Sequence, residues 1–174
     1  MKSLLTSLLL AGMLFFVHTA SAQLPKRTGM IGVSGAIFHF GLNDNVAGPY
    51  LYVQPEIGFF IGNHFAIGPY INVSSIVYND SPYPAYGLGV FMRIVHENLF
   101  FQFSYDSGLA GDDVYEYSKI AIAAGYSIFM TKSFALEPQL LYAAHNEKGD
   151  SFDFDGLGIG LTLQFYIIKN ATTE

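Results

Sequence analysis

The stretch GLGIGLTLQFYI, residues 156–167, alternates between large apolar residues at its odd positions and small or polar residues at most even ones. A period of two is typical of a β-strand, because successive side chains point to opposite faces of a sheet. The stretch therefore predicts a strand with one apolar face. In a water-soluble barrel that face would line the interior, whereas in a membrane barrel it would contact lipid.

The same alternation recurs along the chain, with turn-forming residues between the segments. The other alternating segments are 28–40, 50–61, 65–78, 85–95, 99–106, 118–129 and 134–144. Together with the final segment they predict eight strands and an all-β fold.

The connections between these segments alternate in length. The short ones are 62–64, 95–98 and 130–133, and the long, polar ones are 41–49, 79–84, 107–117 and 145–153. Transmembrane barrels have an even number of antiparallel strands, with short turns on the periplasmic side and longer loops outside. The pattern therefore predicts an eight-stranded antiparallel transmembrane β-barrel of the up-and-down type, located in the outer membrane with both termini in the periplasm.

The two faces of the strands favour the membrane barrel. One face carries Leu, Ile, Val, Phe and Tyr, and the other carries mainly Gly, Ala, Ser, Thr, Gln and Asn. A soluble periplasmic barrel that binds an apolar ligand, like a lipocalin, would need many charged residues on its outside. We therefore expect the residues from Leu157 to Phe165 at odd positions to face lipid, and those from Gly156 to Gln164 at even positions to face the lumen.

Two further features follow from this orientation. Aromatic residues near the strand ends are expected to form girdles at the membrane interfaces. They are Phe59, Phe65, Phe100, Phe129, Phe134 and Tyr166 at the short-turn end, and Tyr50, Tyr78, Tyr83 and Tyr142 at the other. Pro55, Pro69 and Pro138 interrupt strands, and we expect local bulges there because proline cannot donate to a ladder.

Composition supports an exported membrane protein. Residues 1–22 combine Lys2, an apolar run and a small-residue cleavage pattern, which predicts a cleaved secretory signal before a barrel domain at 23–174. The chain is 51% hydrophobic and only 13% charged, which is too apolar for an ordinary secreted domain. It has no cysteine, which excludes disulfides and thiolate chemistry. Removing Lys2 leaves 7 basic against 14 acidic residues, so nucleic acid is not an expected partner.

The chain resembles the small outer-membrane β-barrel proteins of Bacteroidetes, often described as porin-like. The resemblance is carried by the hairpins GFFIGNHFAIGPYI and GYSIFMTKSFALEPQLLY and by the final GLGIGLTLQF. It covers nearly the whole mature chain and implies a barrel, but these generic motifs imply no substrate.

Four charged residues lie on predicted lumen faces, namely Glu56, Arg93, Lys119 and Glu137. Glu56 and Glu137 lie at similar distances from a short turn, and Arg93 lies slightly closer to one, so we expect Arg93 to pair with at least one of these acids. Such a group could act as a proton path, or it could be a structural ion network that fills the lumen. The structural interpretation is favoured, because buried charges persist when paired and an eight-stranded barrel has no open channel.

A second class of function is a lipid-modifying enzyme that acts on lipid A acyl chains, and it would require a set of catalytic groups. Asp106 and Ser107, with His39 and His145, lie near the loop ends of strands. A serine nucleophile needs a base within hydrogen-bond reach, and the sequence does not show such a meeting. We therefore expect no enzymatic activity.

The long loops are acidic, and their main acidic residues are Asp112, Asp113, Glu116, Asp150 and Asp153. They could contact an extracellular protein or a divalent cation, but none has the spacing of a calcium loop. The histidines show no metal-ligand spacing, so no metal or cofactor is expected. We expect a monomer whose surroundings are membrane lipid and lipopolysaccharide, and whose role is structural or one of surface recognition.

Overall fold

The computed structural model describes residues 27–40, 51–78, 81–110, 115–147 and 153–168, and all regular structure in these ranges is β-strand. The strands are β1 (Arg27–Phe40), β2 (Leu51–Ile61), β3 (Phe65–Tyr78), β4 (Ser81–His96), β5 (Leu99–Ala110), β6 (Tyr115–Tyr126), β7 (Ile128–Phe129), β8 (Phe134–Glu147) and β9 (Asp153–Ile168). No helix in the described part of the chain is long and apolar enough to cross a bilayer.

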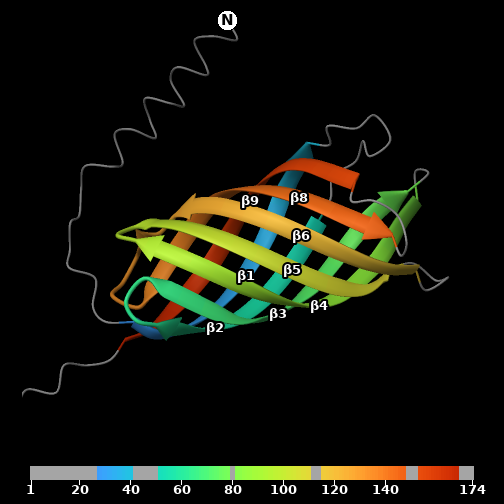
Figure 1. Cartoon of the computed structure of the whole chain (residues 1–174). Helices are drawn as coiled ribbons and strands as arrows, with labels where there is room; N and C mark the ends of the chain where they lie inside the picture. The colour runs from blue at the N-terminus through green and yellow to red at the C-terminus, as the bar shows by residue number, and fades with distance from the viewer. Residues whose placement is uncertain (1–26, 41–50, 79–80, 111–114, 148–152, 169–174) are drawn as a thin grey trace, which may run out of the picture.

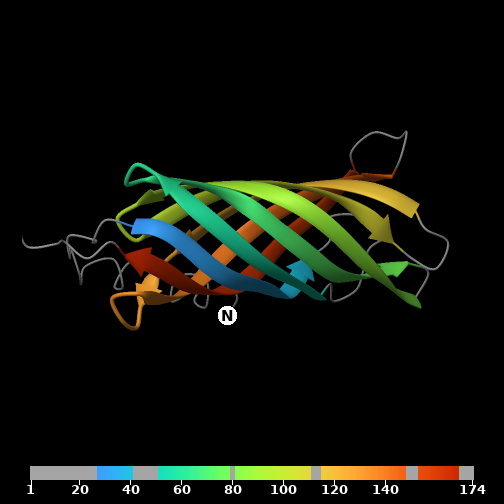
Figure 2. The same ribbon diagram turned by 90° about the horizontal axis from the view of Figure 1, so that it is seen from below.

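The strands close into a barrel in which most pair with their sequence neighbours (Figure 1). Every pairing is antiparallel, β1 closes the ring against β9, and β6 pairs directly with β8. The short β7 continues the line of β6 along β8. β6 and β7 together therefore occupy one strand position, and the nine strands make an eight-stranded barrel. Figure 2 shows the same steeply inclined strands from below. The predicted eight-stranded antiparallel barrel is confirmed.

Pro138 accounts for the interruption between β6 and β7. It lies in β8 opposite this point, and pairing with β8 resumes on either side. Proline has no N–H to donate, so the ladder on the β6 side of β8 is interrupted there. The backbone N–H of Ser127, between β6 and β7, instead donates to the carbonyl oxygen of Asn98 at 2.7 Å.

Pro55 and Pro69 interrupt the ladder between β2 and β3 without changing its register. The pairing has two gaps, one containing Pro55 and the other Pro69, and the same register continues across both. The pairs that border these gaps are Val53↔Val73, Glu56↔Tyr70 and Phe59↔Ile67. The expectation of bulges at the prolines is wrong, since the recorded register shifts lie elsewhere: Arg27/Gly29, Ala36/Phe38 and Ala143/Ala144.

Several strands extend further toward the long loops than the sequence pattern indicated. Parts of the segments 79–84, 107–117 and 145–153, which were predicted as loops, are the ends of β4, β5, β6, β8 and β9. A 14-residue strand at about 3.3 Å per residue and a tilt of about 40° spans about 35 Å along the barrel axis. This length exceeds the apolar band of roughly 25 Å that such barrels present to lipid.

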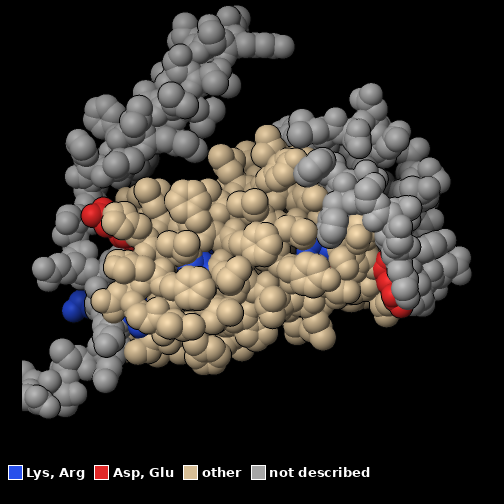
Figure 3. Space-filling view, in the orientation of Figure 1, with Lys and Arg blue, Asp and Glu red and all other residues tan. Residues whose placement is uncertain are grey.

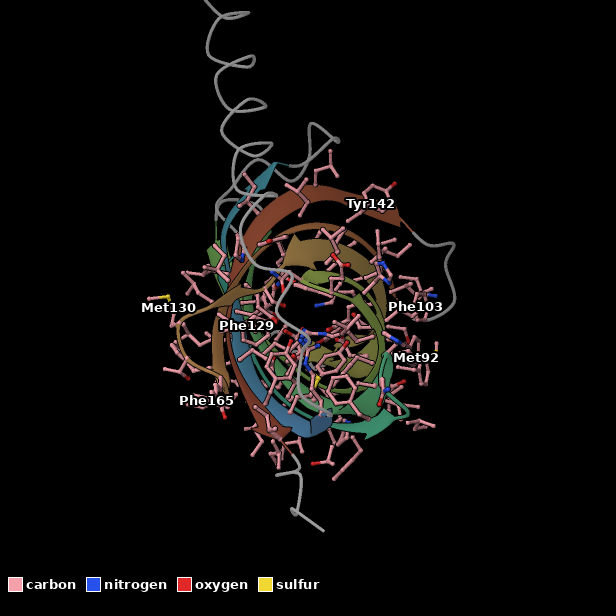
Figure 4. The ribbon with its side chains drawn as sticks, turned by 90° about the vertical axis from the view of Figure 1, so that its left-hand side faces the viewer. Met92, Phe103, Phe129, Met130, Tyr142 and Phe165 are labelled. Carbon is pink, nitrogen blue, oxygen red and sulfur yellow. The ribbon has the colours of Figure 1, made fainter. Side chains whose placement is uncertain are left out.

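The outer wall of the barrel is apolar. Leu88, Val90 and Phe101 are 71%, 57% and 58% exposed, and many other large apolar side chains point outward with them. In Figure 3 the visible side wall is almost entirely tan apart from two small patches of basic residues, and acidic groups appear only at its two ends. Figure 4, an end-on view, shows Met92, Phe103 and Phe165 projecting away from the ring. An exposed apolar surface of this extent is suited to lipid rather than water, so the predicted orientation is confirmed and the chain is a transmembrane β-barrel.

The predicted aromatic girdle is only partly correct. Phe59 and Phe165 are exposed at the short-turn end of the wall, as a girdle requires, but Phe100 and Tyr166 are buried inside the barrel. Both lie on the lumen-facing alternation of their strands, which the prediction overlooked because it considered only their distance from the strand ends. The side chains of Tyr50, Tyr78 and Tyr83 lie outside the described residues.

Candidate functional site: the charged layers of the lumen

Arg93, on β4, is the centre of a buried ion network that closes the lumen. Its Nη2 donates to Glu56 Oε1 at 3.0 Å and its Nη1 donates to Glu137 Oε2 at 2.9 Å. All three side chains have no exposed surface. These three side chains come from β2, β4 and β8, on different sides of the barrel. A single arginine therefore links three strands. The predicted pairing of Arg93 is confirmed, and both acids take part.

Neutral side chains complete this network, and the sequence did not single them out. Arg93 Nε donates to Gln102 Oε1 at 2.6 Å, and Gln102 Nε2 donates to Glu56 Oε2 at 3.2 Å. The hydroxyls of Ser127 and Tyr166 both donate to Glu137 Oε1. Each carboxylate oxygen of both acids therefore accepts at least one hydrogen bond. We call this set, Arg93 with Glu56, Glu137, Gln102, Ser127 and Tyr166, the Arg93 layer.

Aromatic packing isolates the Arg93 layer from water. The Arg93 guanidinium lies 4.4 Å from the ring centroid of Phe100, which is fully buried. A Cβ at Gly125 would lie 2.4 Å from Phe100 Cζ, so only glycine leaves space for this ring. The small lumen residues predicted from the sequence thus make room for large side chains that fill the interior.

Asp106 and Lys119 form a second charged layer, nearer the long loops. Lys119 Nζ lies 3.4 Å from Asp106 Oδ2, which also accepts a hydrogen bond from Tyr70 at 2.7 Å. Asn72 Nδ2 donates to Asp106 Oδ1 at 3.2 Å and to the hydroxyl of Tyr117 at 3.3 Å. Lys119 was predicted to join the same network as Arg93, but the structure pairs it with Asp106 instead. Asp106 was expected on the polar face of its strand and was a catalytic candidate, but its pairing with Lys119 was not predicted.

Arg27 is a third lumen cation that the sequence analysis missed, because it lies at the edge of the first strand. It is 4% exposed, and its guanidinium carbon lies 4.3, 5.3 and 5.8 Å from the ring centroids of Tyr166, Phe129 and Phe60. This cluster closes the short-turn end of the barrel beneath the Arg93 layer. Among the described residues, Arg27 Nη2 has no hydrogen-bond partner.

The buried charges balance formally. Within the described ranges, the fully or nearly buried ionic side chains are Arg27, Arg93 and Lys119 against Glu56, Asp106 and Glu137. A low-dielectric interior requires that buried charges be balanced; five of these six are hydrogen-bonded or ion-paired, and Arg27 packs against aromatic rings. The arrangement is suited to linking the strands across the interior and to obstructing the lumen, since its largest side chains have no exposed surface.

Of the candidate catalytic groups, Asp106 and Ser107 do not converge. Asp106 is buried in the lumen, whereas the next residue, Ser107, is exposed on the outer wall, so these two side chains point away from each other. The side chains of His39 and His145 lie outside the described residues.

The structure describes two of the five acidic residues that were predicted to lie in loops. Glu116 lies in β6 with an exposed side chain and Asp153 is the first residue of β9, so the expectation that both lie in loops is wrong. Asp112, Asp113 and Asp150 lie outside the described residues. The searched part of the chain holds no group of three or more potential metal-ligating side chains.

No known family model matches the chain, and no curated protein matches it. Among solved structures, it is similar to a de novo designed transmembrane β-barrel, with 10% sequence identity, 82% of this chain and 97% of that chain covered, and a TM-score of 0.49. It is also similar to outer membrane protein AlkL, whose structure was solved by solid-state NMR in DMPC lipid bilayers. Here the identity is 9%, the coverage 90% of this chain and 98% of that chain, and the TM-score 0.45. The resemblance to the Bacteroidetes proteins stays a prediction.

Proposed function

We propose that this chain is an integral outer-membrane barrel with a structural or surface-recognition role, whose lumen is closed by side chains rather than open to solutes. The observation that carries the proposal is the Arg93 layer, which joins β2, β4 and β8 across the interior by fully buried hydrogen bonds. A protein built for passive diffusion of solutes would need an open, hydrated lumen, as in larger porins.

The location in the outer membrane follows from two features in combination. Residues 1–22 have the pattern of a secretory signal, and the barrel has the apolar wall of a membrane protein. The short turns would then face the periplasm and the long loops the cell surface. In this role the barrel is a rigid anchor, and recognition would belong to the loops that it displays.

The experiment has two parts. The first is gel mobility of the envelope protein with and without boiling, because folded membrane barrels migrate differently from their heated forms. The second is conductance after reconstitution into a planar bilayer. Heat-modifiable migration with no stable conductance supports the proposal. A protein that is released without detergent contradicts the membrane assignment, and steady conductance of the folded parent contradicts the closed lumen.

A further inference from the structure

Two histidines that are distant in the sequence meet at the short-turn end of the barrel. His64 immediately precedes β3, and His96 is the last residue of β4. Their ring centroids are 6.3 Å apart and the ring planes are inclined by 35°. Both residues are exposed, so the pair is open to solvent. Spacing along the sequence could not reveal the pair, because the antiparallel pairing of β3 with β4 brings the two together.

The His64 ring is oriented by its neighbour. Its Nδ1 lies 3.0 Å from the carbonyl oxygen of Val95. A carbonyl oxygen can only accept a hydrogen bond, so Nδ1 carries the proton and the lone pair of the neutral ring is on Nε2. The backbone of His64 is held as well, since the N–H of Val95 donates to its carbonyl oxygen at 2.7 Å. A histidine whose other ring nitrogen donates to a backbone carbonyl is the usual arrangement at metal sites.

The separation of the rings is close to what one shared ion requires. With a metal–nitrogen distance of about 2.0 Å, the ion lies about 3.2 Å from each ring centroid. Two imidazoles on one ion then have centroids about 5.2 Å apart in tetrahedral geometry and about 6.4 Å apart when opposite each other. The 6.3 Å separation falls within this range.

We propose that His64 and His96 form a two-histidine binding site for a borderline transition-metal ion, Cu²⁺, Ni²⁺ or Zn²⁺. Imidazole nitrogen suits these ions, whereas Mg²⁺ and Ca²⁺ prefer oxygen ligands. No third protein ligand joins the pair within the described residues, so water completes the coordination and the ion exchanges freely. The site lies at the turns, at the short-turn end of the barrel.

Copper titration of the untagged barrel in detergent tests the site. Isothermal titration calorimetry should give one Cu²⁺ bound per chain. His64→Gln and His96→Gln should each weaken binding by at least about tenfold, because the second imidazole of a chelating pair acts at a high effective concentration. His145→Gln, on β8 at the opposite end of the barrel, is the matched control and should bind like the parent. The absence of cysteine leaves no thiol to compete for copper.

Electron paramagnetic resonance of the copper-loaded parent should show coupling to two nitrogen nuclei, and the single variants should show one. The unheated band on a gel confirms that each variant is folded before it is titrated. The proposal is overturned if the double variant His64→Gln/His96→Gln binds copper as tightly as the parent, or if His145→Gln weakens binding equally. Because the measurement is made in detergent, its outcome is independent of the cellular location proposed above.

Discussion

At the scale of single residues, stability inside this barrel depends on whether each buried polar atom has a partner. Arg93 donates three hydrogen bonds, one to Gln102 and one to each of the two acids, Glu56 and Glu137. The pairing was predictable, because Arg93, Glu56 and Glu137 share the lumen face and lie at similar depths. The roles of Gln102 and Tyr166 were not predictable, since a sequence pattern gives the face of a side chain but not its rotamer.

Arg93→Met should lower the free energy of unfolding by about 3–5 kcal/mol, because two buried carboxylates lose their cation. Combining it with Glu56→Gln and Glu137→Gln should restore much of this loss, since no uncompensated charge then remains. Urea unfolding in lipid vesicles measures both effects. A single variant as stable as the parent would mean that the network contributes nothing.

Two glutamines provide a matched comparison within the lumen. Gln164 is fully buried, yet neither polar atom of its amide has a hydrogen-bond partner among the described residues. Gln102 accepts from Arg93 and donates to Glu56. Gln164→Met should therefore stabilise the barrel by about 1–3 kcal/mol, whereas Gln102→Met should destabilise it by a similar amount. The same urea experiment decides, and a loss of stability in Gln164→Met would show that its amide is satisfied in solution.

At the scale of elements, the alternation of side chains predicted the strands and their orientation, but not all of their ends. Segments such as SPYP at 81–84 and SGLA at 107–110 have turn-like composition, and yet they pair with their neighbours as strand. Strand formation there follows from hydrogen bonding to the adjacent strand rather than from the local preference of these residues for strand. The same tertiary effect keeps Pro55 and Pro69 in register despite the bonds they remove.

The seam between β2 and β3 should be the more dynamic of the two seams that flank β3. Its pairing has two gaps, whereas β3 and β4 pair without interruption from Phe65 to Tyr78. We expect the amide protons of Ile57 and Ile71 in detergent to exchange faster than those of β3 that bond to β4. Pro55→Val with Pro69→Val should slow the exchange at this seam, because it restores two donors. Hydrogen exchange followed by NMR measures this, and equal rates at both seams in the parent would contradict it.

At the scale of the whole molecule, the direction in which the apolar faces point decides whether the barrel belongs in a membrane. The sequence allowed either a soluble or a membrane barrel in principle, and the scarcity of charge on both faces favoured the membrane. The structure places those faces outward over the barrel wall (Figure 3). It also fills the interior with polar and aromatic side chains, which explains why a chain that is 51% hydrophobic has so few apolar residues in its core.

Folding of two arginine variants into lipid vesicles tests this orientation most directly. Val90, in the middle of β4, and Met130, at the short turn between β7 and β8, are both exposed, at 57% and 65%. Val90→Arg places a cation near the bilayer midplane and should destabilise the folded barrel by about 2–4 kcal/mol, whereas Met130→Arg, near the interface, should cost about 0–1 kcal/mol. We expect this difference in urea titrations of the vesicle-inserted protein. Equal stability of the two variants would contradict an outward-facing, lipid-exposed Val90.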